Sequence, residues 1–125
     1  MGSRLRGRRI VIAVADEAFR DALRRTLGRE GADTLVFPVG AGLLESIQPF
    51  NPHACIIDVD LPDLGPEDLV IGIRSLNAAL PVILVSAHLF PGDAPALHDL
   101  PTLPLPFGRV QLLDLLDRNL NGRAA

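Results

Sequence analysis

Short, continuous runs of apolar residues alternate with amphipathic stretches along most of this chain. The clearest runs are Arg9–Val14, His53–Val59 and Pro81–Ser86, all rich in β-branched residues. A run that is apolar at consecutive positions is typical of a strand covered on both faces, as in a parallel sheet. Parallel neighbours need crossover connections, which the amphipathic stretches can supply. The pattern therefore predicts an α/β fold with a parallel sheet between two layers of helices.

Four of the intervening stretches carry the signals of helices. Asp16 offers an N-cap for the first, and Gly42–Gln48 is a short second helix that Pro49 is expected to end. Pro66 suits the first turn of the third, and Arg109–Leu120 is the last. The apolar positions expected to face the core are Phe19, Ala22, Leu23, Thr26, Leu27, Leu43, Leu44, Ile47, Leu69, Val70, Ile73, Leu76, Val110, Leu113, Leu116 and Leu120.

Two shorter strands complete the expected sheet, Thr34–Phe37 and Leu103–Leu105. Before the second of these, prolines recur too often for a regular helix, so Ala94–Leu100 can make no more than a turn or two. In the last helix, Leu112 and Leu115 fall outside the apolar stripe. Either a wide core-facing surface or a bound partner would explain them.

The composition restricts the functions open to the chain. Its 125 residues fit one domain, which we place at residues 9–121 behind a flexible, arginine-containing tail at residues 1–8. The net charge of -3 argues against a general binder of nucleic acid. No membrane span or signal-peptide pattern is found, so we expect a cytoplasmic protein. The single cysteine, Cys55, lies in an apolar run and is expected to pack in the core.

Reactive groups of open parallel sheets gather at the carboxyl ends of the strands, near the point where strand order reverses. Four segments are expected there: Val14–Glu17, Asp58–Pro62, Ser86–His88 and Leu105–Phe107. Asp58 ends one of the most continuous apolar runs. It is therefore the best candidate for the centre of a functional site.

Four short motifs follow one another along the chain. Phe19–Arg20 lies early in the first helix, and Ile57–Pro62 contains an aspartate that ends a strand and is followed by a proline. Pro81–Ala87 is a strand that ends in serine and a small residue, and Pro106–Phe107 follows the last strand. Together, over residues 8–120, they resemble a response-regulator receiver domain. The resemblance implies a flavodoxin-like, doubly wound five-stranded parallel sheet of order 2-1-3-4-5, with a shortened or irregular fourth helix.

The resemblance also implies a phosphotransfer site. Asp58 would be the phosphoacceptor, whose carboxylate attacks a phosphoryl group, and Ser86 would be the hydroxyl that reports the change. This chemistry requires Mg²⁺ held by carboxylates, for which Asp58, Asp60 and Asp16 are candidate ligands. It also requires a lysine that neutralises charge on the phosphoryl group.

The sequence departs from the family around this site. Aligned without a gap, the family's paired acidic positions fall on Val14 and Ala15, which cannot ligate a metal. A two-residue gap would place Asp16 and Glu17 there instead. The lysine position falls on Leu105, and the chain contains no lysine at all. The site therefore keeps its nucleophile without several of the charged groups that the family uses.

We expect a receiver-like signalling domain of a two-component phosphorelay, and no enzyme activity beyond self-phosphorylation at Asp58. In one version a histidine kinase or phosphotransfer protein phosphorylates Asp58. In the other, a pseudo-receiver contacts a downstream protein, or a second copy as a homodimer, through the segment before Leu103, the strand Leu103–Leu105 and the helix Arg109–Leu120. Neither nucleic acid nor membrane is an expected partner. A small-ligand binder or enzyme on the same fold is the alternative.

Overall fold

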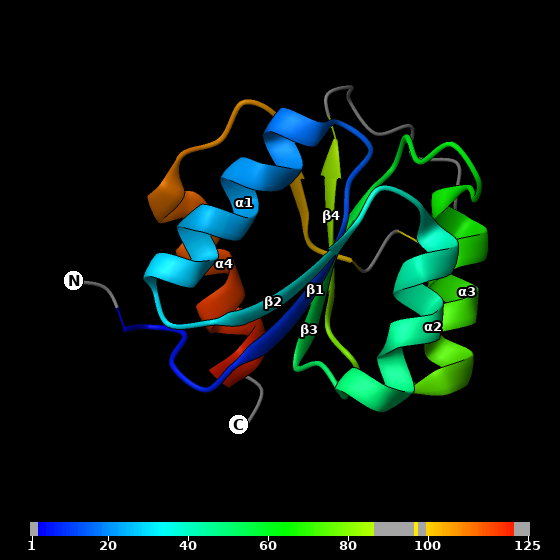
Figure 1. Cartoon of the computed structure of the whole chain (residues 1–125), viewed down its shortest axis with the longest axis horizontal. Coiled ribbons are helices and arrows are strands. Elements are labelled where there is room, and N and C mark those ends of the chain that lie inside the picture. The colour runs from blue at the N-terminus through cyan, green and yellow to red at the C-terminus, as the bar shows by residue number, and fades with distance from the viewer. Residues whose placement is uncertain (1–2, 87–96, 98–99, 122–125) are drawn as a thin grey trace.

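The computed structural model describes residues 3–86, 97 and 100–121, which form a five-stranded parallel sheet between two layers of helices (Figure 1). The strand order is β2-β1-β3-β4-β5, and every neighbouring pair is parallel. The predicted α/β class and doubly wound order are therefore confirmed. The strands are β1 (Arg9–Ala13), β2 (Asp33–Phe37), β3 (Ala54–Asp58), β4 (Val82–Ser86) and β5 (Thr102–Pro104).

Side chains alternate along the central strands and divide the core into two halves. In β1, Ile10 and Ile12 belong to one half, while Val11 and Ala13 belong to the other. Successive residues of a strand point to opposite faces, and both faces are buried here, which accounts for the unbroken apolar runs. Cys55 of β3 lies in the second half, and burial raises the pKa of its thiol to about 12. Its predicted packing in the core is confirmed.

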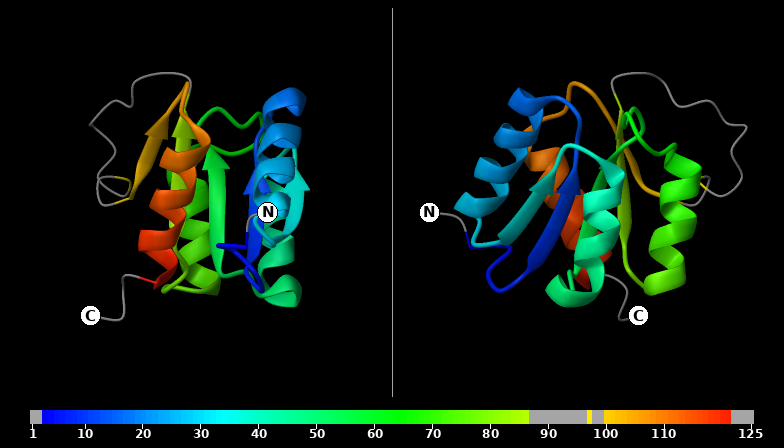
Figure 2. Two further views of the ribbon diagram at one scale, coloured as in Figure 1. Left: turned by 90° about the vertical axis from the view of Figure 1, so that its left-hand side faces the viewer. Right: turned by 45° about the vertical axis from the view of Figure 1, so that its right-hand side comes forward.

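Of the described helices, two lie on each face of the sheet (Figure 2). One face carries α1 (Glu17–Arg29) and α4 (Arg109–Asn121), and the other carries α2 (Gly40–Phe50) and α3 (Pro66–Leu76). The Asp16 carboxylate accepts the N–H of Phe19 at 3.3 Å and caps α1, and α3 begins at Pro66, both as predicted. Leu76, the last residue of α3, is 39% exposed, so the prediction that it faces the core is wrong.

The second helix is longer at both ends than the sequence indicates. It begins at Gly40 and runs through Pro49 to Phe50, so the prediction that Pro49 ends it is wrong. A proline at this position removes the hydrogen bond that its own N–H would donate to the carbonyl of Glu45 and crowds that carbonyl, and the helix ends one residue later. Glu45 is exposed, and water can take the place of that donor. The helix ends at Asn51, whose φ of 52° is left-handed.

The C-terminal helix α4 turns a wide apolar surface toward the sheet. Leu112, Leu113 and Leu116 are buried, and Leu115 packs against them, so a wide core-facing surface explains the leucines outside the predicted stripe. Val110, in contrast, is 63% exposed, and its predicted place in the core is wrong. With 3.6 residues per turn, it lies roughly 100° around the helix from the centre of the buried surface.

Residues 3–8, expected to belong to a flexible tail, pack against the domain. Leu5 is 1% exposed and joins the half of the core that α1 and α4 cover. Its N–H donates to the carbonyl of Glu30 at 2.9 Å. Gly31 has a φ of +94°, and a Cβ there would lie 3.0 Å from the Cα of Arg6. The glycine thus permits the close passage of this segment.

The segment between β4 and β5 lies mostly outside the described residues. Residues 87–96 and 98–99 belong to that part, so the irregular fourth helix, including a turn or two at Ala94–Leu100, stays a prediction. Leu97 is 3% exposed and packs in the half of the core covered by α2 and α3. None of the described helices has the length and apolar character needed to cross a bilayer.

Candidate functional site

Asp58 is the last residue of β3 and lies at the carboxyl end of the sheet, beside the end of β1. Its Oδ2 accepts the N–H of Ala15 at 3.3 Å, and its Oδ1 accepts the N–H of Asp60 at 3.0 Å. The chain places β2 on one side of β1 and β3 on the other, so strand order reverses here. Open α/β sheets bind ligands at such a point. The structure thus places Asp58 where the sequence predicts a site.

A hollow of ≈ 290 Å³ opens over Asp58. Its lining combines carboxylates with apolar side chains. The residues that line it are Ala15, Asp16, Phe19, Asp58, Asp60 and Leu105. A carboxylate can attack a phosphoryl group, but the transfer also depends on neutralising the charge on the phosphoryl oxygens. From the described part of the chain, the lining supplies the predicted nucleophile and no cationic side chain.

The three predicted Mg²⁺ ligands, Asp16, Asp58 and Asp60, line this hollow together. Within the part of the chain that the structure describes, however, no three His, Cys, Asp or Glu side chains are placed to hold a metal ion. Asp16 caps α1, and both carboxylate oxygens of Asp58 accept backbone N–H groups. Mg²⁺ is usually held by one or two carboxylates together with water, so these contacts do not decide the assignment of Asp16, Asp58 and Asp60 as ligands, which stays a prediction.

The positions that the resemblance assigns to further charged residues carry apolar side chains. Val14 is fully buried in the core, whereas Ala15 and Leu105 line the hollow over Asp58. In the gapped alternative, Asp16 and Glu17 would be the acidic pair. Only Asp16 lines this hollow; Glu17 begins α1 and lines a different one.

Leu105 belongs to the segment between β5 and α4. The rings of Phe107 and Phe19 meet edge to face, with centroids 5.8 Å apart at 65°. The peptide bond between Leu105 and Pro106 is cis. Leu105 also lines a second, largely apolar hollow of ≈ 240 Å³ against α1. The position that the resemblance assigns to the family's lysine therefore carries an apolar side chain that lines both hollows.

Ser86 ends β4, the neighbour of β3. In the β3–β4 register Asp58 pairs with Val85, so the backbone of Ser86 lies one residue beyond the level of Asp58. Its backbone pairs with Pro104 on the other side. The role of Ser86 as a switch hydroxyl stays a prediction.

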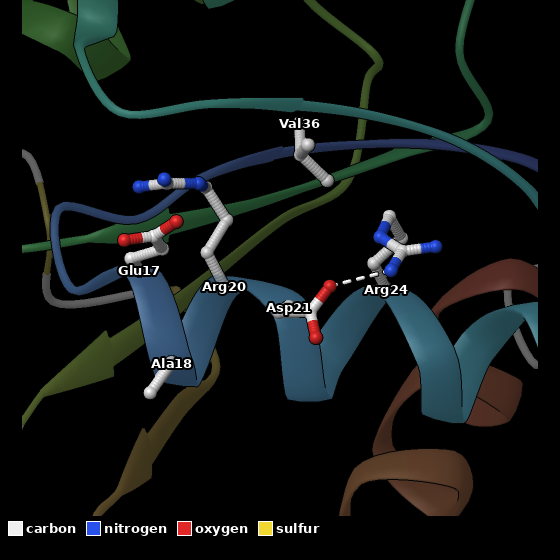
Figure 3. Close-up of a pocket in the computed structure, with 6 residues that line it drawn as sticks. All are labelled: Glu17, Ala18, Arg20, Asp21, Arg24 and Val36. Atoms are coloured by element: carbon white, nitrogen blue, oxygen red, sulfur yellow. Dashed lines mark hydrogen bonds and ion pairs between the residues drawn. The ribbon is translucent and has the colours of Figure 1, made fainter.

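A larger hollow of ≈ 480 Å³ lies between α1 and β2 (Figure 3). Figure 3 shows Arg20 and the ion pair of Asp21 with Arg24 in its lining. The Arg20 guanidinium donates to the carbonyls of Val14 at 2.8 Å and Ala15 at 3.2 Å. These charges are engaged within the chain, which makes this hollow a poorer ligand site. Arg20 instead fixes the end of β1, where the Ala15 N–H meets Asp58.

Asp63, in the loop after β3, is a residue that the sequence did not single out. Its Oδ1 accepts the N–H of Gly40 at 2.8 Å, and its Oδ2 accepts the N–H of Ala41 at 3.0 Å. These two bonds are the main causes that lower the pKa of the Asp63 carboxyl. An aspartate between proline and a glycine-containing turn has the appearance of an ordinary turn residue, so the sequence carries no signal of this contact.

Comparison with known proteins identifies the family. Residues 10–99 match the response regulator receiver domain. This chain belongs to the response-regulator receiver family. The receiver is 31% identical over 108 residues to response regulator MprA of Mycobacterium ulcerans, in an alignment that covers 84% of the chain and 47% of that relative. The chain thus spans about half the length of the curated relatives that it matches.

Solved structures with the same fold agree with this assignment. A CheY-like receiver domain from Methanospirillum hungatei superposes with a TM-score of 0.85 at 20% identity, covering 92% of this chain and 94% of that one. TrrA of Thermotoga maritima, solved in complex with Mg²⁺-BeF, gives a TM-score of 0.83 at 18% identity, with 90% and 99% covered. The flavodoxin-like fold is confirmed. The receiver is a domain of two-component signalling, and the alternative of a small-ligand binder or enzyme is not favoured.

Proposed function

We propose that this receiver acts chiefly through protein contacts, and that Mg²⁺-dependent phosphorylation at Asp58 is weak or absent. Its partners are a histidine kinase or phosphotransfer protein and a downstream protein of the same pathway. Binding of a partner, more than the presence of a phosphoryl group, then sets the state of the domain.

The lining of the hollow over Asp58 carries this proposal. An incoming phosphoryl group would meet the carboxylates of Asp16, Asp58 and Asp60 and the apolar side chains of Ala15 and Leu105. Because phosphoryl transfer relies on cations that neutralise developing charge, the carboxylates repel the group without compensation from this lining. Asp58 retains its position and its two backbone donors. Among the described residues, the lining thus keeps the proposed nucleophile and lacks a cationic side chain.

The edge of the sheet beside α4 supports the part of the proposal that concerns contacts. Among the described strands, β5 has β4 as its only neighbour. A hollow of ≈ 310 Å³ lies between this strand and α4, lined by Thr102, Leu103, Gln111, Asp114, Leu115 and Arg118. A sheet edge offers backbone groups to a partner, and a neighbouring hollow can accept a side chain. We assign the partner contact to β5, α4 and the segment that precedes β5.

Phosphorylation by a small-molecule donor tests the proposal. The chain is incubated with phosphoramidate and Mg²⁺, and its intact mass is measured over time. We expect little or no added phosphoryl mass on the wild type and none on Asp58→Asn. Rapid, stoichiometric addition to the wild type that is lost in Asp58→Asn would contradict the proposal, because it would show that the remaining residues suffice for the transfer.

A further inference from the structure

The loop that follows Asp58, residues 59–65, is held at both of its ends by carboxylates. At its start, the N–H of Asp60 donates to Asp58 Oδ1 at 3.0 Å. Near its end, both carboxylate oxygens of Asp63 accept the first two N–H groups of α2, at 2.8 and 3.0 Å. The residues between these contacts are thus tied to the functional aspartate on one side and to a helix on the other.

The second helix depends on this loop for its cap. Its N-cap residue is Val39, which makes no side-chain cap hydrogen bond. The first N–H groups of a helix need acceptors from outside the helix, and a carboxylate there also interacts favourably with the helix dipole. Asp63 supplies both from a position 23 residues further along the chain than Gly40. Asp63 thus caps α2 as Asp16 caps α1, but Asp63 is distant from its helix in the sequence whereas Asp16 directly precedes its own.

A second, apolar contact joins the same two segments. A Cβ built at Gly40 would lie 3.0 Å from Leu64 Cδ1, so this leucine of the loop sits directly on the start of α2. Leu64 and Leu61 both pack in the half of the core that α2 and α3 cover. The loop therefore meets the helix through a charged contact and an apolar contact side by side.

We propose that Asp63 is a positioning residue for Asp58: by capping α2 it holds residues 59–65 in the arrangement in which the Asp60 N–H reaches the Asp58 carboxylate. The inference rests on the proposed function only in taking Asp58 as the functional centre. Asp63 acts through the loop and touches no reacting atom.

Two backbone amides give separate readouts of the helix and of the loop. The Ala41 N–H reports the capping of α2, and the Asp60 N–H reports the contact with Asp58; both are followed by NMR amide exchange and chemical shift. In Asp63→Ala we expect exchange at Ala41 to accelerate about fivefold, the factor that corresponds to ~1 kcal/mol for an N-cap. We expect the Asp60 amide to shift and to exchange faster as well. In Asp63→Asn, which keeps one acceptor oxygen, both effects are expected to be smaller, and this variant serves if Asp63→Ala does not fold.

A compensating variant separates positioning from simple stabilisation of the helix. Val39 has the extended backbone of an N-cap residue, with φ -137° and ψ 156°, so Val39→Asp gives α2 a cap of its own that reaches Ala41. In Val39→Asp/Asp63→Ala we expect protection to return at Ala41 while Asp60 stays altered. Recovery of both amides, or an Asp60 amide that Asp63→Ala leaves unchanged, would overturn the proposal.

Asp33→Asn is the control for the loss of one negative charge. Asp33 is exposed at the start of β2, at the opposite end of the sheet, and this variant removes the same charge as Asp63→Asn. It is expected to leave Ala41 and Asp60 unchanged; a shift at Asp60 would overturn the assignment to Asp63. None of these readouts requires a phosphoryl group. A chain that proves to be readily phosphorylated would contradict the proposed function and leave the test of Asp63 intact.

Discussion

The two ends of the sheet differ in what their polar groups do. At the amino ends of the strands, the N–H of Arg9 donates to His53 Nδ1 at 2.9 Å, and the N–H of His53 donates to the Arg9 carbonyl at 2.7 Å. Nearby, the buried carboxylate of Glu30 pairs with Arg109 at 2.6 Å and accepts the N–H of Arg4 at 3.3 Å. That ion pair, followed by the bond from Arg4, lowers the pKa of the Glu30 carboxyl. At this end, polar contacts join segments of the scaffold to one another.

At the carboxyl ends of the strands, polar contacts hold loops rather than strands. Asp58, Asp63 and Arg20 each bond backbone groups of neighbouring segments. Ala15 and Leu105 line the hollow, at positions where the resemblance to the family implies charged side chains. The comparison teaches that polar groups at this end position Asp58 and the loops around it, whereas those at the amino end fasten the scaffold.

The largest effect is expected from Leu5→Ala at the amino end. Leu5 is buried in the core, and truncating a buried leucine typically costs about 2–5 kcal/mol of unfolding free energy. Urea unfolding followed by circular dichroism measures the change, and the Asp60 amide at the far end is expected to stay in place. A loss below about 0.5 kcal/mol, the usual range for surface substitutions, would favour the flexible tail that the sequence suggests for residues 1–8.

The next largest effect is expected from adding charged residues beside Asp58, at the carboxyl end of the sheet, which should speed phosphorylation. Ala15→Asp/Leu105→Lys places an acid and a lysine at the positions where the family has them. We expect phosphoryl incorporation from phosphoramidate and Mg²⁺ to accelerate about 100-fold, since one preorganised charge-stabilising group is typically worth that factor. Intact mass spectrometry measures the rate, and adding Asp58→Asn must abolish it. If the double variant stays inert while remaining folded, the missing charges are not what limits the site.

A smaller, pH-dependent effect is expected at the contact between His53 and Arg9. Burial, with the neighbouring charges of Arg9 and Arg8, lowers the pKa of His53 from its ordinary value of 6.5. Only a neutral ring can accept the Arg9 N–H, because an imidazolium has no acceptor nitrogen. A pKa lowered in the folded state gives stability that is present above 6.5 and is lost as pH falls through the folded value.

Comparison with His53→Asn isolates this contribution from other titrating groups. The asparagine Oδ1 can replace the Nδ1 acceptor but does not titrate in this range. Between about pH 7.5 and pH 5.5, we expect the wild type to lose about 1 kcal/mol more unfolding free energy than His53→Asn, the net value of one hydrogen bond. Parallel pH profiles of the two proteins would show that His53 is not part of the scaffold at this end.

The fold was predictable where burial is the same on both sides of a strand. β1 and β3 are apolar at consecutive positions because helices cover both faces, and this pattern predicts a parallel sheet without further information. Leu5 was not predictable, because a single leucine among arginines carries no periodicity, and its burial depends on Glu30 and Gly31. A pattern of apolar residues predicts contacts that repeat along a strand or helix. It does not predict the contacts of a single residue such as Leu5.

The sequence predicts the position of Asp58, at the centre of the candidate site, but not that of Asp63, which holds the neighbouring loop. Asp58 ends a recognisable strand, and the ends of neighbouring parallel strands meet at one edge. Ala15 and Leu105, to which the ungapped alignment assigns charged positions of the family, both line the hollow, and that assignment stays a prediction. Asp63 was missed because its partners on α2 lie 22 and 23 residues away in sequence, and only the folded chain brings them together.

The smallest effect is expected at Val110, whose apolar side chain the sequence places in the core. It is 63% exposed at the start of α4, whereas Leu112, two residues later, is 1% exposed. Val110→Ala should therefore change the unfolding free energy by less than about 0.5 kcal/mol, while Leu112→Ala should cost about 2–5 kcal/mol. The same urea titration measures both. A large loss in Val110→Ala would contradict the exposed position of this side chain at the start of α4.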